Sequence, residues 1–147
     1  MTVAIDTGRW TRIGETSNST YYEITARILA AVPLPGSRDD EDTAKENLDF
    51  QQTALAKVGG GVVLVFFDNM VSQDKNARRV YQTVPDPAVL RGTALVGGSL
   101  MSRAMGSFFL GLSKPRVRLQ MFGSAEEAVA WGEEVNREMD GARGGSR

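Results

Sequence analysis

The fold of this chain is decided by residues 91–135, which read RGTALVGGSLMSRAMGSFFLGLSKPRVRLQMFGSAEEAVAWGEEV. This stretch predicts a strand, a helix, a second strand and a second helix, in that order. Two glycines and Ser99 open the first helix, and Pro115 ends the connection that follows it. Ser124 begins a Ser-x-x-Glu capping box, the clearest local signal in the chain, which opens the last helix. A strand–helix–strand–helix unit is typical of α/β proteins with parallel strands.

The N-terminal part of the chain predicts a hairpin of two antiparallel strands. Polar and apolar residues alternate over residues 21–30, which is typical of a strand with one better-buried face. A weaker strand is expected over residues 9–13, with a turn between the two. Pro33 and Pro35 are expected to stop the longer strand.

Helices and strands alternate between this hairpin and residue 91. An acidic first turn predicts a helix over residues 39–58, followed by a run of three glycines suited to a left-handed cap. The buried face of this helix is expected to carry Ala44, Leu48, Gln51, Leu55 and Val58. Residues 62–67 are apolar throughout, as in a central strand covered on both faces. A further helix is expected to begin near Ser72, to turn Ala77, Val80, Tyr81 and Val84 inward, and to end before Pro85.

These elements together predict an α/β sandwich whose mixed sheet has an N-terminal hairpin followed by βα units. We expect one domain over residues 1–140 and a disordered tail over residues 141–147, which read GARGGSR. Trp131 is expected to anchor the last helix to the core, together with Ala128, Val135 and Met139.

The composition excludes several kinds of chemistry. The 147 residues include no cysteine and no histidine, so disulfides, thiolate chemistry and Ser-His-Asp or Cys-His catalysis are ruled out. An enzyme would have to use carboxylates, lysine, tyrosine or serine, and no pair of these has a persuasive spacing. The four acidic residues at 39–42 point in different directions, so we expect no bound metal and no cofactor.

The charge and hydropathy of the chain limit its partners and its location. A net charge of −1 indicates no general attraction to nucleic acid. The longest fully apolar run, residues 62–67, is too short to span a membrane. The N-terminal sequence MTVAIDTGRW lacks the basic start and apolar core of a signal peptide. A cytoplasmic protein without a membrane span is therefore expected.

A family pattern runs through residues 91–135: a small-residue strand, then S-P-x-S-R-x-x-x-N-F-F, K-P, and an aromatic residue before an acidic helix with A-x-x-W. The matching residues are Ser99, Ser102, Arg103, Phe108, Phe109, Lys114, Pro115, Phe122, Ala128 and Trp131. The chain departs from the pattern at Leu100, Ser107 and Arg118. On these residues it resembles an uncharacterised bacterial branch of the SpoIIAA-like, or STAS-type, domains. The resemblance implies a SpoIIAA-like fold and a regulatory role.

The resemblance also directs attention to one hydroxyl group. The better-known antagonists of this family switch partners when a hydroxyl in a D-S-S-G or D-S-T-G turn is phosphorylated. The corresponding residues 68–74 read DNMVSQD, so Ser72 is the one weak phosphorylation candidate. The alternative is that Ser72 is a helix N-cap with Asp74 in the first turn.

The residues that open the first helix of the deciding stretch form a candidate anion site. Free backbone N–H groups and a hydroxyl converge where Gly97, Gly98 and Ser99 turn a strand into a helix. Ser102 and Arg103, one turn further on, add a hydroxyl and a positive charge. The alternative is that the glycines allow a tight turn and Ser99 caps the helix.

The same helix carries a wide apolar surface. Apolar residues cover more than half of its circumference, although contact with a core on one side needs a narrower stripe. The candidate interface residues are Leu100, Met101, Met105, Phe108 and Phe109. The helix either is buried on two sides or contacts a partner. Five basic residues could steer an acidic partner, pair subunits or stand on solvated edges, and they are Arg91, Arg103, Lys114, Arg116 and Arg118.

Two hypotheses for the function follow. The first is a non-enzymatic regulatory or scaffolding protein that acts by protein–protein interaction, with a homodimer as the expected assembly. The second is a module that binds a small anionic ligand, such as a nucleotide, a phosphate or a lipid, at the helix N-terminus formed by residues 97–103.

Overall fold

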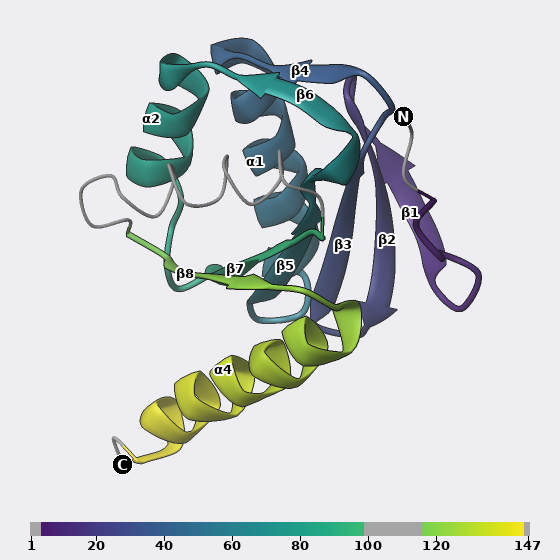
Figure 1. Cartoon of the computed structure of the whole chain (residues 1–147). Helices are drawn as coiled ribbons and strands as arrows, with labels where there is room; N and C mark the ends of the chain where they lie inside the picture. Colours follow the sequence, from purple (N-terminus) through teal and green to yellow (C-terminus); the bar gives the residue numbers. More distant parts are fainter. Residues whose placement is uncertain (1–3, 99–115, 146–147) are drawn as a thin grey trace.

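The computed structural model describes residues 4–98 and 116–145, with side chains to residue 142. A six-stranded sheet in the order β1-β2-β3-β5-β7-β8 forms its centre (Figure 1). The strands are β1 (Thr11–Glu15), β2 (Ser19–Thr25), β3 (Ile28–Pro33), β5 (Gly61–Phe66), β7 (Leu90–Val96) and β8 (Arg118–Phe122). β1, β2 and β3 pair antiparallel, whereas β3, β5, β7 and β8 pair parallel. The predicted mixed sheet, an N-terminal hairpin followed by βα units, is therefore confirmed.

Helices cover both faces of this sheet. Helices α1 (Glu41–Ala56) and α2 (Lys75–Thr83) pack on one face, and α4 (Ala125–Gly145) packs on the other (Figure 1). Leu29 and Val63 point from the sheet towards α1 and α2, while their neighbours Ile28 and Val62 point towards α4. This alternation gives the molecule two apolar layers. No helix within the described ranges combines the length and the apolar composition of a membrane span.

The predicted strand over residues 21–30 is wrong, because the chain forms two strands there. β2 and β3 are joined by a tight turn at Ala26 and Arg27, and Tyr21 pairs with Ala31. Along most of the ladder, an odd-numbered residue of β2 pairs with an odd-numbered residue of β3, and an even-numbered one with an even-numbered one. Paired residues point to the same face of the sheet, so odd and even residues keep their faces from one strand to the next. A period of two therefore cannot reveal where one strand ends.

A second sheet of two short parallel strands was not predicted. β4 (Ser37–Asp39) pairs with β6 (Met70–Gln73), which follows the 3-10 turn η1 (Phe67–Asn69). This pairing shortens both predicted helices. Asp39 pairs with Gln73 and so belongs to a strand, which leaves Asp40 as the N-cap of α1. The residues predicted to form the first turns of the two helices instead form strands β4 and β6.

The predicted inward faces of α1 and α2 are confirmed except at their last residues. Ala44, Leu48, Gln51 and Leu55 are buried, as are Ala77 and Val80, while Tyr81 is partly buried and packs against the same core. Val58 and Val84 are 42% and 49% exposed, so these two predictions are wrong. Each stands just beyond the end of its helix. The glycine run behaves as predicted, since φ is +81° at Gly59 and +99° at Gly60.

The last helix is attached as predicted. The hydroxyl of Ser124 accepts a hydrogen bond from the Glu127 N–H at 3.3 Å and so caps α4. Ala128 and Val135 are buried against the sheet, with Trp131 and Met139 beside them. α4 continues to Gly145, past residue 140, where the sequence places the end of the domain.

Candidate functional site

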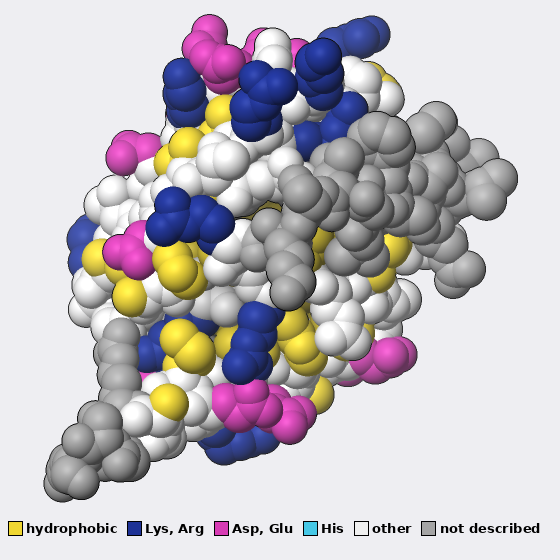
Figure 2. All heavy atoms as spheres, turned by 90° about the vertical axis from the view of Figure 1, so that its left-hand side faces the viewer, with side chains coloured by type: hydrophobic (Ala, Val, Ile, Leu, Met, Phe, Trp, Pro, Cys, Tyr) yellow, Lys and Arg dark blue, Asp and Glu magenta, His cyan; other side chains and the backbone are white. Residues whose placement is uncertain are grey.

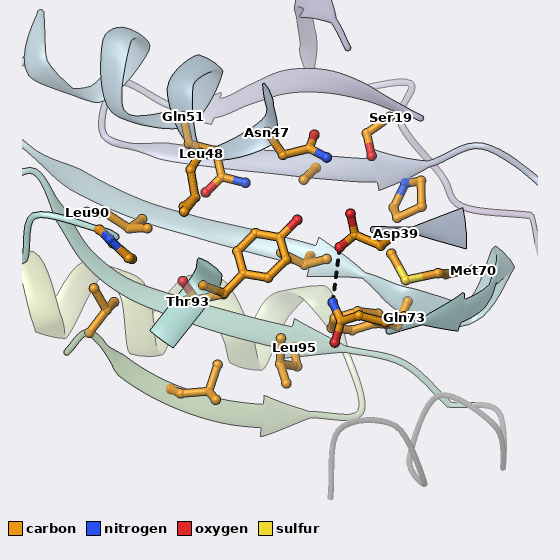
Figure 3. Close-up of a pocket in the computed structure, with 18 of the residues that line it drawn as sticks. Ser19, Asp39, Asn47, Leu48, Gln51, Met70, Gln73, Leu90, Thr93 and Leu95 are labelled. Carbon is orange, nitrogen blue, oxygen red and sulfur yellow. Dashed lines mark hydrogen bonds between the residues drawn. The ribbon is translucent and has the colours of Figure 1, made fainter. Parts of the chain in front are cut away.

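A cavity of about 50 Å³ lies between the sheet and α1, with room for a few water molecules (Figure 3). Leu48, Leu90 and Leu95 form part of its apolar wall. The polar residues that line it are Ser19, Tyr21, Asp39, Asn47, Gln51, Gln73, Tyr81 and Thr93. They come from both sheets and both helices on this face, so the cavity lies where these elements meet.

The polar groups of this cavity form a hydrogen-bonded network. The hydroxyl of Tyr21 donates to Asn47 Oδ1 and accepts from Gln51 Nε2, both at 2.8 Å. Asp39 accepts from the Thr43 hydroxyl at 2.6 Å and from Gln73 Nε2 at 3.1 Å, the bond drawn in Figure 3. Buried polar groups need such partners, because an unsatisfied one costs about 1–3 kcal/mol. The network therefore helps to fix α1 against the sheet.

The two tyrosines of the cavity act as hydrogen-bond donors. Burial raises the pKa of Tyr21 far above its usual value, and it raises the pKa of Tyr81 in the same direction, aided by the nearby Asp39 carboxylate. Both phenols therefore stay protonated at neutral pH. Within the described part of the chain, no three carboxylates stand close enough to hold a metal ion. The cavity thus offers one carboxylate and neutral donors to a water-sized guest.

Two members of the predicted anion site, Gly97 and Gly98, lie within the described residues. The Gly97 N–H donates to the Phe122 carbonyl at 3.2 Å, and the Gly98 N–H donates to Asp68 Oδ2 at 3.3 Å. Both amides already have an acceptor from the chain, and the acceptor at Gly98 is an anion. A carboxylate in that place repels a second anion. The other members of this candidate site, Ser99, Ser102 and Arg103, lie outside the described residues, as do the interface candidates Leu100, Met101, Met105, Phe108 and Phe109.

The expected N-cap at Ser72 is wrong, because Ser72 lies in β6, where it pairs with Arg38. Asp74 caps α2 instead, since its carboxylate accepts from the Ala77 N–H at 2.8 Å. Ser72 therefore stands two residues before the cap. The phosphorylation of this hydroxyl stays a prediction.

The sequence places Arg91 among five basic residues that could face a partner, and its position in the structure corrects that expectation. Its side chain has no exposed surface. The guanidinium donates to Asp140 Oδ1 at 3.0 Å and to the Gly59 carbonyl at 3.0 Å. Asp140 also binds Arg27, and these two cations lower the pKa of Asp140 to about 2, with the Arg27 hydrogen bond as the larger cause. Arg91 is thus a structural residue.

Of the remaining basic candidates, the structure describes Arg116 and Arg118, which bind acceptors on different elements. Arg118 is exposed and pairs with Glu138 at 2.6 Å, and Arg116 donates to the Thr83 carbonyl at 3.1 Å. Arg103 and Lys114 lie outside the described residues. On the face shown in Figure 2, several Lys and Arg side chains gather at the top, and farther down basic and acidic side chains are interspersed. Because Arg91 is buried and Arg118 pairs with Glu138, these two residues give no support to steering of an acidic partner.

A groove of about 520 Å³ lies on the other side of α1, between that helix and the edge formed by β1 and β2. We call it the α1 groove. Its apolar lining consists of Ile13, Ala26, Leu29, Phe50, Ala54, Leu55 and Val58. Its charged lining consists of Glu15, Glu23, Glu46, Asp49 and Lys57. This site was missed in the sequence because part of its lining comes from the strands and turns at residues 13–29, and its only readable signal was the spacing of Phe50, Ala54 and Val58.

The α1 groove is held in shape by contacts between β1 and α1. Glu46 accepts hydrogen bonds from the backbone N–H of Ser17, at 3.1 Å, and from its hydroxyl. Phe50 packs on the backbone of Gly14, where an added Cβ would lie 2.8 Å from the ring. The same ring contacts Tyr21 with centroids 4.3 Å apart. The groove therefore has a fixed floor and a fixed wall.

Comparisons with solved structures gave two similar proteins. The structure is similar to that of the anti-sigma factor antagonist SpoIIAA in its unphosphorylated form, with 14% identity, 76% of this chain and 94% of that chain covered, and a TM-score of 0.46. It is also similar to an uncharacterised protein of the DUF3478 family with a SpoIIAA-like fold from Shewanella loihica PV-4. There the identity is 12%, the coverage is 90% of this chain and 98% of that chain, and the TM-score is 0.44. A search of curated proteins gave no significant match.

The fold and the site define an α/β protein with a mixed sheet, a polar cavity beneath its first helix and an acidic groove beside that helix. The family model described as "Domain of unknown function (DUF7793)" matches residues 22–136. The chain belongs to this family.

Proposed function

We propose that this chain is a non-enzymatic regulatory or scaffolding protein that acts by binding another protein. The observation that carries the proposal is the α1 groove. Phe50 and Ala54 pack against the edge of the core beneath α1, and with Val58 just beyond the helix they also line the open groove. Val58 is 42% exposed. A row of apolar side chains left partly open beside a groove is typical of a contact surface.

The proposal agrees with what the sequence resemblance implies. SpoIIAA-like domains that are better known act on other proteins without catalysis. The cavity also supports a non-enzymatic role, because its Tyr21 hydroxyl and Asp39 carboxylate are already hydrogen-bonded to neighbouring side chains. A network of this kind stabilises a binding scaffold.

A direct test is chemical cross-linking in the native cell, followed by purification of the chain and mass spectrometry. We expect one specific protein to be joined to the chain and absent from a control purification with the tag alone. Recovery of the chain without any cross-linked protein, together with a bound small molecule, would contradict the proposal.

The homodimer is part of the same proposal. Phe108 and Phe109 are the residues that the sequence favours for it, and both lie outside the described part of the chain. Size-exclusion chromatography with light scattering is expected to give a dimer for the wild type and a monomer for Phe108→Asp. If the wild type and Phe108→Asp are both strict monomers, the homodimer proposal is contradicted. The proposed contact with a different protein would then still stand.

The anionic-ligand alternative gains no support from the two glycines that the structure describes. Thermal-shift measurements with nucleotides, inorganic phosphate and acidic lipids test it directly. We expect no stabilisation at millimolar ligand, because Asp68 already accepts from the Gly98 N–H. A clear shift in melting temperature that is lost in Arg103→Ala would favour the alternative.

A further inference from the structure

We infer that the α1 groove binds an amphipathic helix with a lysine- or arginine-rich flank, supplied by another protein. This inference rests on the proposed function and names the class of partner. Three observations carry it, which are the spacing of the groove residues on α1, the irregular edge of β1, and the sign of the charges around the groove.

The residues of α1 that line the groove have helical spacing. They are Glu46, Asp49, Phe50, Thr53, Ala54 and Lys57, and Val58 continues the row just beyond the helix. Steps of three and four residues form a straight row along a helix. At 1.5 Å per residue the row from Glu46 to Val58 is about 18 Å long. A partner helix of three to four turns matches that length.

The apolar lining suits a helix. Small Ala54 stands between the larger Phe50 and Val58, which leaves a recess for a side chain of the partner. Ile13 lines the groove from β1 and is 37% exposed, while Val58 is 42% exposed. A helix laid between α1 and β1 would bury both, as helices do in apolar grooves.

The edge of β1 is poorly suited to the other common mode, the addition of a partner strand. The register of β1 shifts between Arg12 and Gly14, so Ile13 stands in a bulge. A bulge bends a strand and interrupts the regular row of backbone groups that a new strand needs. The groove is therefore a better site for a helix than β1 is for a strand.

The charges around the groove favour a basic partner. Four carboxylates and one ammonium group line it, for a net charge of −3. Glu15 pairs with Arg12 at 3.1 Å and Glu46 binds Ser17, whereas Glu23 and Asp49 stand exposed on opposite sides of the groove. Complementary charges raise the association rate and set the orientation of a partner.

The test uses the whole chain and a pair of designed 14-residue peptides. One peptide is a helix with leucine and alanine four residues apart on one face and lysine on its flanks, and its twin carries glutamate in place of lysine. Binding is measured by fluorescence polarisation, and the site is mapped by amide chemical-shift changes. We expect the lysine peptide to bind at least about tenfold more tightly than its twin, with shifts along residues 46–58 and in β1 and β2.

Two groove variants are paired with matched controls. Val58→Gln and Asp49→Lys are each expected to weaken the lysine peptide at least about fivefold, because one removes apolar contact and the other reverses a facing charge. Val84→Gln, which also stands just beyond a helix, and Glu134→Lys, on the exposed side of α4, are expected to change binding less than about twofold.

Several outcomes would overturn the inference. Equal affinity for both peptides, or shifts confined to the outer edge of β1, would exclude a basic helix in the groove. A dimer that light scattering shows to be broken by Val58→Gln would mean that a second copy fills the groove. If a protein cross-linked in the native cell is retained by both Val58→Gln and Asp49→Lys, the groove inference fails while the proposed function stands. If no protein is cross-linked at all, the proposed function fails.

Discussion

Arg91 connects three parts of the chain from a position with no exposed side-chain surface. From β7 it contacts Asp140 on α4 and the carbonyl of Gly59 in the turn after α1. Gly60 makes room for it, because an added Cβ there would lie 2.8 Å from Arg91 Nε. The two glycines thus provide the turn and also the space for the arginine.

Replacement of Arg91 is expected to be costly. Arg91→Ala should lower the free energy of unfolding by about 3 kcal/mol, since it removes the bonds of a buried guanidinium to Asp140 and to the Gly59 carbonyl and opens a void. Urea denaturation measures this. The control is Arg118→Ala, which breaks an ion pair whose side chains are about half exposed and should cost less than about 1 kcal/mol. Equal effects would contradict the structural role of Arg91.

Asp140 gives a dependence on pH with a definite sign. Its pKa is lowered from 3.8 to about 2 in the folded chain, first by Arg27 and then by Arg91. A lowered pKa adds stability above the unfolded value, and that stability is lost as the pH falls towards the folded value. The difference in stability between the wild type and Asp140→Asn should therefore be constant above pH 5 and shrink between about pH 4 and pH 2. A difference that grows on acidification would contradict this assignment.

The elements show how far the sequence can predict this fold. The central strand and the capped last helix could be predicted because local signals and tertiary packing agree there. β4 and β6 are too short to give a period, and only their mutual pairing makes them strands. The start of α2 was misplaced because Ser72 and Asp74 are both good caps, and the pairing of Gln73 with Asp39 decides between them.

The choice of cap can be tested on α2. Asp74→Ala should cost about 1 kcal/mol of stability because the Ala77 N–H loses its acceptor. Ser72→Ala should change stability by less than about 0.5 kcal/mol, because Ser72 is not the cap. Thermal unfolding of both variants checks the pair. A larger loss for Ser72→Ala would restore the cap that the sequence predicts.

At the scale of the whole molecule, the two faces of the sheet are covered differently. α4 packs against β3, β5, β7 and β8 on one face, whereas α1 leaves part of the β1–β2 edge open on the other. The candidate site arises from this difference. Its wall on α1 could be predicted from the spacing of Phe50, Ala54 and Val58. Its opposite side could not, because Ile13 and Glu23 reach the groove only through the turns of the hairpin and a bulge.

The sequence candidates at residues 99–109 stay predictions. They concern a homodimer and an anion site, and both are tested by experiments on Phe108 and Arg103. The α1 groove is independent of them, since every residue that lines it lies in residues 13–58. The central claim is therefore that this chain binds a partner helix through the α1 groove.

The most direct test of this claim is an exchange of charge across the groove. A lysine of the basic peptide that faces Asp49 is replaced by glutamate, and both peptides are titrated against the wild type and Asp49→Lys. We predict that the wild type prefers the lysine peptide and that Asp49→Lys prefers the glutamate peptide, each by at least about threefold. The same order of affinities for both proteins would contradict the account.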